Sequence, residues 1–222
     1  YAAWQQERLT DAGLRDGLAY WRAQLGGVEP LALPADRPRA AERDVSGAGV
    51  PVQLAGDRAA AIEAVSRRLG VTPFVTLLTA YAMTLARHTG RLDFAVGSPV
   101  AGRSRPEFED LVGPFLNPVA LRCRLSGDPT FAQAVAAVRT TWLDAQAHAD
   151  VPFERVVDEV LPHRDLSRTP IYQVGFDLQT GGLATAGAAD PAADLAFQQA
   201  WRVAKTDLTF FVWHRAGGAM TG

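Results

Sequence analysis

The four histidines and the single cysteine are the side chains of this sequence best suited to catalysis or metal binding. No histidine has a cysteine or a second histidine at ligand spacing, so we expect no metal site; the four are His88, His148, His163 and His214. Cys123 stands between Arg122 and Arg124, but neighbours on a strand point to opposite faces, which favours a buried core thiol over an activated one. The serine-nucleophile, phosphate-loop, dinucleotide-binding and zinc-protease motifs are all absent.

Composition excludes several classes of protein. The 222 residues are 48% hydrophobic and 21% charged, which is typical of a globular domain, and 22 basic against 24 acidic residues give a net charge of −2. Because no basic run could neutralise a phosphate backbone, nucleic acid is not an expected partner. One cysteine allows no internal disulfide, and no apolar stretch reaches the ~18–20 residues of a membrane span, so we expect a cytoplasmic protein without a membrane segment.

Helices and strands are expected to alternate along the chain. Apolar residues at helical spacing after Thr10 predict a helix over 11–25, and four prolines over 28–47 predict an extended connection. Further helices are expected at 57–69, 73–88, 108–112, 128–147 and 152–160, and strands at 50–54, 93–100, 118–125, 171–178, 195–203 and 207–213. This order, without internal repeats, predicts an α/β fold: a two-layer sandwich of a mixed sheet and helices.

Four segments carry a family resemblance. They are residues 1–4 (YAAW), 112–122 (VGPFLNPVALR, preceded by SPVAGR at 98–103), 148–154 (HADVPFE) and 164–171 (RDLSRTPI). In order and spacing they resemble motifs of the condensation domains of nonribosomal peptide synthetases, which have the chloramphenicol-acetyltransferase-like fold. Leu116 and Pro118 depart from the family pattern, where valine and threonine are usual.

The resemblance implies that residues 1–222 are the C-terminal part of one condensation domain. Residues 1–27 would be the entry helix and subdomain junction, 28–49 an extended connection, and 50–222 an α/β subdomain truncated at its end. Such domains form an amide bond between donor and acceptor thioesters. The family's H-H-x-x-x-D-G motif is absent from this sequence, so we expect the chain alone to be inactive.

The partners implied by the resemblance are donor and acceptor peptidyl carrier domains, the missing N-terminal subdomain and an adjacent adenylation domain. No cofactor would be bound directly, because phosphopantetheine is carried by the carrier domains. An alternative is a non-catalytic member of the fold that recruits tailoring enzymes to a synthetase-bound peptide. Heterocyclisation and small-molecule acetyl transfer are less favoured by these motifs.

Two residues are candidates for the substrate tunnel. Asn117 could donate to and accept from a pantetheine amide, or could simply be a turn-forming asparagine before proline. Ser98 could offer a hydroxyl to the tunnel or make a hydrogen bond at the end of its strand.

The remaining candidates have structural or carrier-binding interpretations. Asp165 and Arg168, with Arg164 beside them, are expected to form a charge pair that fixes their loop. Asp150 and Phe153 are expected at the start of a helix, the first near its positive end and the second in the core. Two loop arginines could meet an acidic carrier surface or a phosphate, or could be solvated; they are Arg103 and Arg105.

Overall fold

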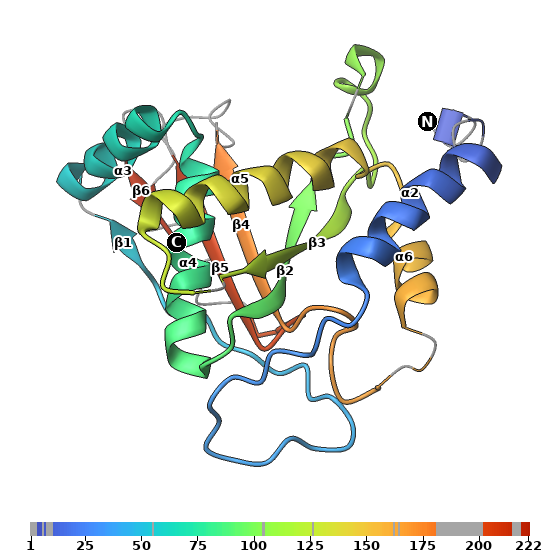
Figure 1. Ribbon diagram of the computed structural model, residues 1–222, viewed down its shortest axis with the longest axis horizontal. Helices are drawn as coiled ribbons and strands as arrows, with labels where there is room; N and C mark the ends of the chain where they lie inside the picture. The colour runs from blue at the N-terminus through green and yellow to red at the C-terminus, as the bar shows by residue number, and fades with distance from the viewer. Residues whose placement is uncertain are drawn as a thin grey trace.

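The computed structural model places one mixed sheet at the centre of the chain (Figure 1). It describes residues 4–5, 7, 11–54, 56–103, 105–125, 127–161, 163, 165–180, 202–214 and 219–222. Within these ranges the strand order is β1-β6-β5-β4-β2-β3. The strands are β1 Gln53–Leu54, β2 Asp93–Val100, β3 Asn117–Arg124, β4 Val174–Thr180, β5 Leu208–His214 and β6 Met220–Thr221. β4 runs parallel to β2 and to β5, and the remaining pairs are antiparallel.

The helices begin and end at recognisable signals. They are α2 Asp11–Leu25, α3 Gly56–Leu69, α4 Pro73–Thr89, α5 Phe131–Ala147 and α6 Phe153–Val160, with a short 3-10 helix, η1, at Pro106–Phe108. α4 starts with Pro73 at its first position and ends at Gly90, whose φ of 68° suits glycine. α5 starts at a capping box, in which Thr130 and Gln133 satisfy each other's backbone N–H groups.

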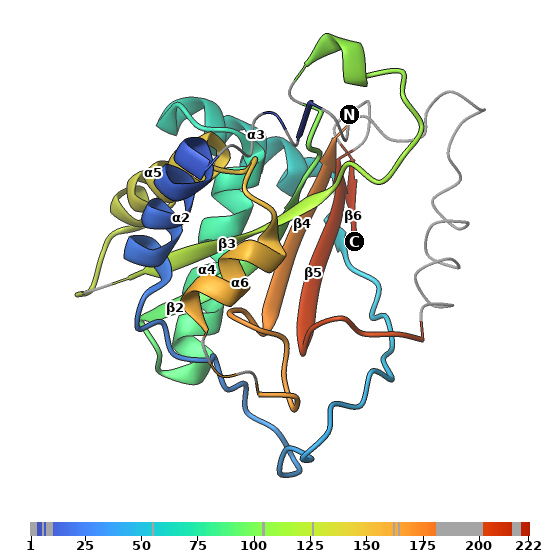
Figure 2. The same ribbon diagram turned by 90° about the vertical axis from the view of Figure 1, so that its right-hand side faces the viewer.

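Helices α4 and α5 cover one face of the sheet (Figure 2). Phe74 on α4 lies with its ring centroid 4.2 Å from that of Trp142 on α5 and 5.2 Å from that of Phe176 on β4. Tyr81, two turns further along α4, contacts both Phe176 and Phe210 of β5. Of these rings that of Phe176 is fully buried, which contributes about 1.5–3 kcal/mol of transfer free energy, and the other rings are partly buried around it.

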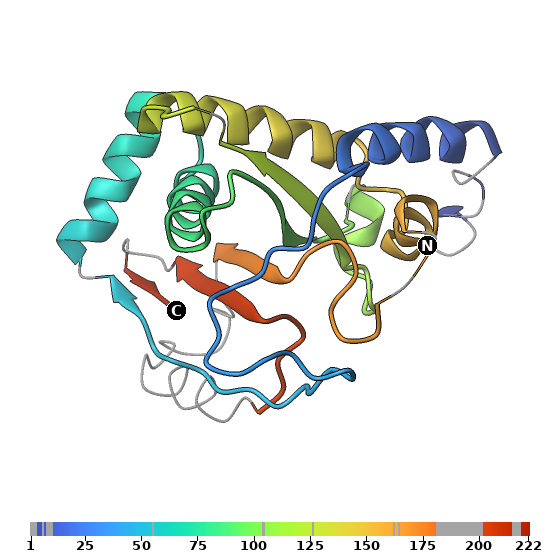
Figure 3. The same ribbon diagram turned by 60° about the horizontal axis from the view of Figure 1, so that its bottom comes forward.

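A strap, residues 28–49, crosses the end of the sheet between α2 and β1 (Figure 3). Leu31 is buried, and its N–H donates to Oε1 of Gln173 at 2.7 Å. Arg39 donates to the Ser167 carbonyl at 3.1 Å and pairs with Asp207. The strap therefore lacks helix and strand, apart from one bridge at Ser46, yet is held by side chains along its length.

Several expected element boundaries differ from the structure. The strand expected at 50–54 is confined to 53–54, and the helix expected at 108–112 is replaced by η1 at 106–108. The strand expected from 171 begins at Val174, because Ile171 has a φ of 66° that interrupts extended backbone. In the strand expected at 195–203, residues 195–201 lie outside the described residues.

No single described helix is long and apolar enough to cross a membrane; α3 and α4 meet that criterion only together and are bent by 102° to each other.

Candidate functional site

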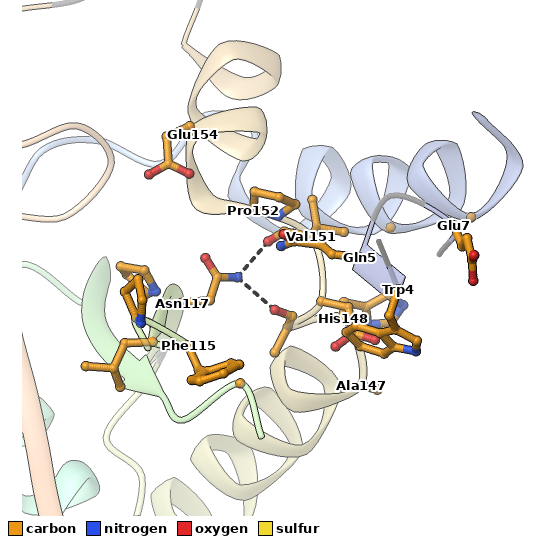
Figure 4. A pocket seen from close by; sticks show the side chains of 18 of the residues that line it. Trp4, Gln5, Glu7, Phe115, Asn117, Ala147, His148, Val151, Pro152 and Glu154 are labelled. Atoms are coloured by element: carbon orange, nitrogen blue, oxygen red, sulfur yellow. Dashed lines mark hydrogen bonds between the residues drawn. The ribbon is translucent and has the colours of Figure 1, made fainter. Parts of the chain in front are cut away.

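A pocket of about 620 Å³ opens beside the start of β3 (Figure 4). Its walls come from the first described residues, α2, the loop that precedes β3, and the connection between α5 and α6. Asn117, His148, Phe115 and Trp4 are among the lining residues. The segments 112–122 and 148–154, which are distant in sequence, thus meet at one place.

Asn117 joins these two segments through its side-chain amide. Its Nδ2 donates to the carbonyl of Ala149 at 2.7 Å and to that of Val151 at 2.8 Å, and its Oδ1 accepts from the N–H of Phe153 at 3.1 Å. Both amide hydrogens are therefore used within the chain, so Asn117 has no donor left for a pantetheine carbonyl. It is also not a turn residue, because it is the first residue of β3.

His148 is held in one orientation at the rim of α5. Its ring stacks on that of Tyr20 with centroids 3.9 Å apart, and its Nδ1 lies 2.8 Å from the Asp144 carbonyl. Because a carbonyl only accepts, Nδ1 carries a hydrogen in this contact. Trp21 donates to the His148 carbonyl at 3.1 Å. Burial, and then the charge of Asp144, raises the pKa of Tyr20 to about 12, so this phenol stays protonated.

The described side chains that line the pocket carry negative charge. Among the described residues, its lining contains four carboxylates and neither arginine nor lysine; the acids are Glu7, Asp16, Asp150 and Glu154. These four carboxylates would repel a phosphate group.

Ser98 lies inside β2 rather than at the pocket. It is 2% exposed and is paired in register with Val119, on the sheet face that α4 and α5 cover. Its Oγ has no hydrogen-bond partner within the described residues, so the expected strand-end hydrogen bond is not found there.

The two loop arginines contact their own loop. Arg103 donates to the carbonyls of Phe108 and Glu109, and its guanidinium carbon lies 4.2 Å from the ring centroid of Phe115. Arg105 is exposed and lies 3.3 Å from Glu107. Arg103 therefore stabilises the fold of this loop, whereas the side chain of Arg105 is exposed to solvent.

Asp165 holds the start of the segment 165–171 through contacts with Ser167 and Arg168. Its Oδ1 accepts from the N–H and the hydroxyl of Ser167 at 2.9 and 2.6 Å, and its Oδ2 lies 2.6 Å from Nε of Arg168. These contacts lower the pKa of Asp165, with the hydrogen bonds from Ser167 as the largest cause. Arg164 lies outside the described residues.

Asp150 and Phe153 lie on opposite sides of the helix start. Asp150 is exposed at the pocket, whereas Phe153 is the first residue of α6, with its ring centroid 5.4 Å from that of Tyr172 in the core.

The sequence did not reveal the stacking of Tyr20 on His148, because no local pattern relates residues so far apart in the chain. It also missed Gln173, which is 2% exposed, because an isolated glutamine gives no sequence signal.

Comparison with known proteins identifies the family. The family model for the condensation domain matches residues 1–219. The chain belongs to the condensation domain family.

Curated relatives of this condensation domain include very long proteins. One of the subunits of linear gramicidin synthase from Brevibacillus parabrevis is 50% identical over 180 residues, which cover 81% of this chain and 2% of the relative. Malpinin synthetase of Mortierella alpina is 38% identical over 98% of this chain and 3% of its own length. The chain thus spans only a few per cent of these synthetases.

Solved structures give the same fold. The crystal structure of the X-domain from teicoplanin biosynthesis has a TM-score of 0.82 and 28% identity over 100% of this chain and 53% of its own. That of SgcC5 protein from Streptomyces globisporus has a TM-score of 0.77 and 26% identity, and the chain covers 52% of it. The predicted α/β class and acetyltransferase-like architecture are therefore confirmed.

Proposed function

We propose that this chain is the C-terminal part of a condensation domain that forms amide bonds between carrier-tethered donor and acceptor thioesters in nonribosomal peptide synthesis. The observation that carries the proposal is the family match over residues 1–219, supported by 50% identity to part of a gramicidin synthase. The partners would be two peptidyl carrier domains, the N-terminal subdomain and an adenylation domain.

The chemistry would be aminolysis of a thioester. The acceptor amine attacks the donor carbonyl, a C–N bond forms, the C–S bond breaks, and the leaving thiolate takes up the proton that the amine loses. Holding both substrates in one tunnel makes the step effectively unimolecular, which can lower its barrier by up to ~7–11 kcal/mol. The proton-transfer histidine that the family resemblance implies is not one of the four here, since none is followed three residues later by Asp-Gly.

The test is a reconstitution with loaded carrier domains. The 222-residue chain alone should give no dipeptide, whereas the complete domain should turn over. Robust product from the chain alone would overturn the expectation that catalysis needs the missing half.

A second candidate function is a docking platform without catalysis. It is favoured by the likeness to the X-domain, which has also been solved as a complex with OxyB from teicoplanin biosynthesis. The higher identity to gramicidin synthase makes catalysis the preferred proposal. Binding of a tailoring oxygenase by a complete domain that makes no amide would reverse this preference.

A further inference from the structure

The face of β4 and β5 opposite α4 carries four side chains that the motifs do not include. Phe176 and Phe210 contact α4, and because neighbours on a strand alternate, Asp177 and Phe211 point to the other side. The register pairs Asp177 with Phe211 and Gln179 with Trp213, which places all four on one patch. Figure 2 shows α4 on one side of these strands.

Asp177 has no cationic partner within the described residues. Nε2 of Gln179 lies 3.1 and 3.0 Å from its two carboxylate oxygens, and no other hydrogen bond to them is found there. The carboxylate is partly buried, and this burial raises its pKa. Burial without a counter-charge disfavours an ionised carboxylate, and within the described residues the Gln179 amide is the group that compensates Asp177.

The aromatic rings of Phe211 and Trp213 add further partial negative charge next to the carboxylate. The ring centroids of Phe211 and Trp213 lie 4.3 Å apart, and both side chains are partly buried. Aromatic faces carry partial negative charge and attract cations. Since Gln179 binds Asp177 through its NH₂ group, its Oε1 is left as a further acceptor. The patch therefore combines three electron-rich features, and it complements an ammonium group rather than a phosphate or a neutral acyl chain.

We propose that Asp177 and Gln179, flanked by Phe211 and Trp213, bind the protonated amine of the acceptor aminoacyl group. This inference rests on the proposed function, because amide formation requires an amine-bearing acceptor. The carboxylate binds the ammonium ion before the amine is released for attack, so Asp177 is a determinant of acceptor affinity.

The experiment measures binding to the complete condensation domain by calorimetry. The probes are an aminoacyl pantetheine amide with a free α-amine and the same molecule with that amine acetylated. Asp177→Asn keeps the shape of the side chain and its contact with Gln179 but removes the charge. It should lower the affinity for the amine probe by about tenfold and leave the affinity for the acetylated probe unchanged. The matched control is Asp57→Asn, at an exposed position in the first turn of α3, which should change neither affinity. Equal affinity of Asp177→Asn and wild type for the amine probe would overturn the inference, and so would an equal loss for both probes.

Two further readouts separate the possible failures. If Asp177→Asn does not fold, Gln179→Met is the second variant: a loss of affinity for the amine probe alone supports the patch, and unchanged affinity overturns it. If wild type forms amide from loaded carriers while Asp177→Asn keeps full amine affinity, the inference alone fails. If Asp177→Asn loses amine affinity in a domain that forms no amide, the amine site holds and the proposed function fails.

Discussion

The amide of Asn117 donates to the carbonyl of Val151 at 2.8 Å, across 34 residues of sequence. With its bonds to Ala149 and Phe153, this side chain fastens the start of β3 to the connection between α5 and α6. The pocket wall formed by that connection therefore depends on one residue of β3.

Asn117→Ala should destabilise the chain by about 2–4 kcal/mol, because two carbonyls and one N–H lose their partner. For a chain of this length, each kcal/mol lowers Tm by roughly 2–4 °C, which thermal unfolding followed by circular dichroism would detect. Leu116→Ser, at the exposed neighbouring position, is the control and should leave Tm nearly unchanged. A Tm of Asn117→Ala equal to that of wild type would contradict the fastening role.

Arg122→Met should be about as damaging. Its side chain, 9% exposed, pairs with Asp93 at 2.7 Å and donates to the carbonyls of Gln24 and Gly26 at the end of α2. We expect a loss on the order of 2–4 kcal/mol in chemical denaturation. Arg124→Met, two residues along the same strand but exposed, should cost less than about 1 kcal/mol; equal losses would contradict the assignment.

The same pair predicts a pH dependence. The hydrogen bond from Arg122 is the largest cause that lowers the pKa of Asp93 in the folded chain. The stabilisation is therefore complete above the unfolded pKa, near ~4, and is lost as the pH falls through the lowered folded value. The stability difference between wild type and Asp93→Asn should be constant from about pH 7 to about 5 and shrink below ~4. A difference that grows on acidification would have the wrong sign.

Gln173→Met should loosen the strap. Gln173 accepts from Leu31 N–H at 2.7 Å and donates to the Thr169 carbonyl at 3.0 Å, so the substitution leaves both backbone groups without a partner. Hydrogen exchange of residues 28–49 should quicken by at least ~10-fold if local opening becomes easier by about 1.4 kcal/mol or more. Gln146→Met, exposed on α5, should leave that exchange unchanged.

Cys123 should be inert in the folded chain. Burial, and then the charge of Asp93, raises its pKa to about 12, so almost no thiolate exists at about pH 8. Iodoacetamide should label Cys123 only after unfolding in guanidinium chloride. Cys123→Val should not be labelled under either condition, because no other cysteine is present. Fast labelling of the folded wild type would show that the strand opens readily.

The sequence predicted the helices and strands better than their contacts. The helix that the sequence places at 128–147 starts later, at Phe131, because the Thr130–Gln133 capping box outweighs Asp128-Pro129 as a start signal. Alternation identified β3, but it could not reveal that Asn117 binds three backbone groups 32 to 36 residues away. Long-range hydrogen bonds depend on how α6 folds back on the sheet, which local propensity does not encode.

The contacts of the strap bear on how synthetases could be recombined. Residues 28–49 have the proline-rich sequence of a linker, which invites their use as a junction between halves from different parents. Yet Leu31 is bonded to Gln173, and Arg39 is paired with Asp207, so each side of such a junction has its partners far along the chain. A chimera joined inside this segment would inherit mismatched partners unless residues 165–173 and 202–207 were exchanged together with it.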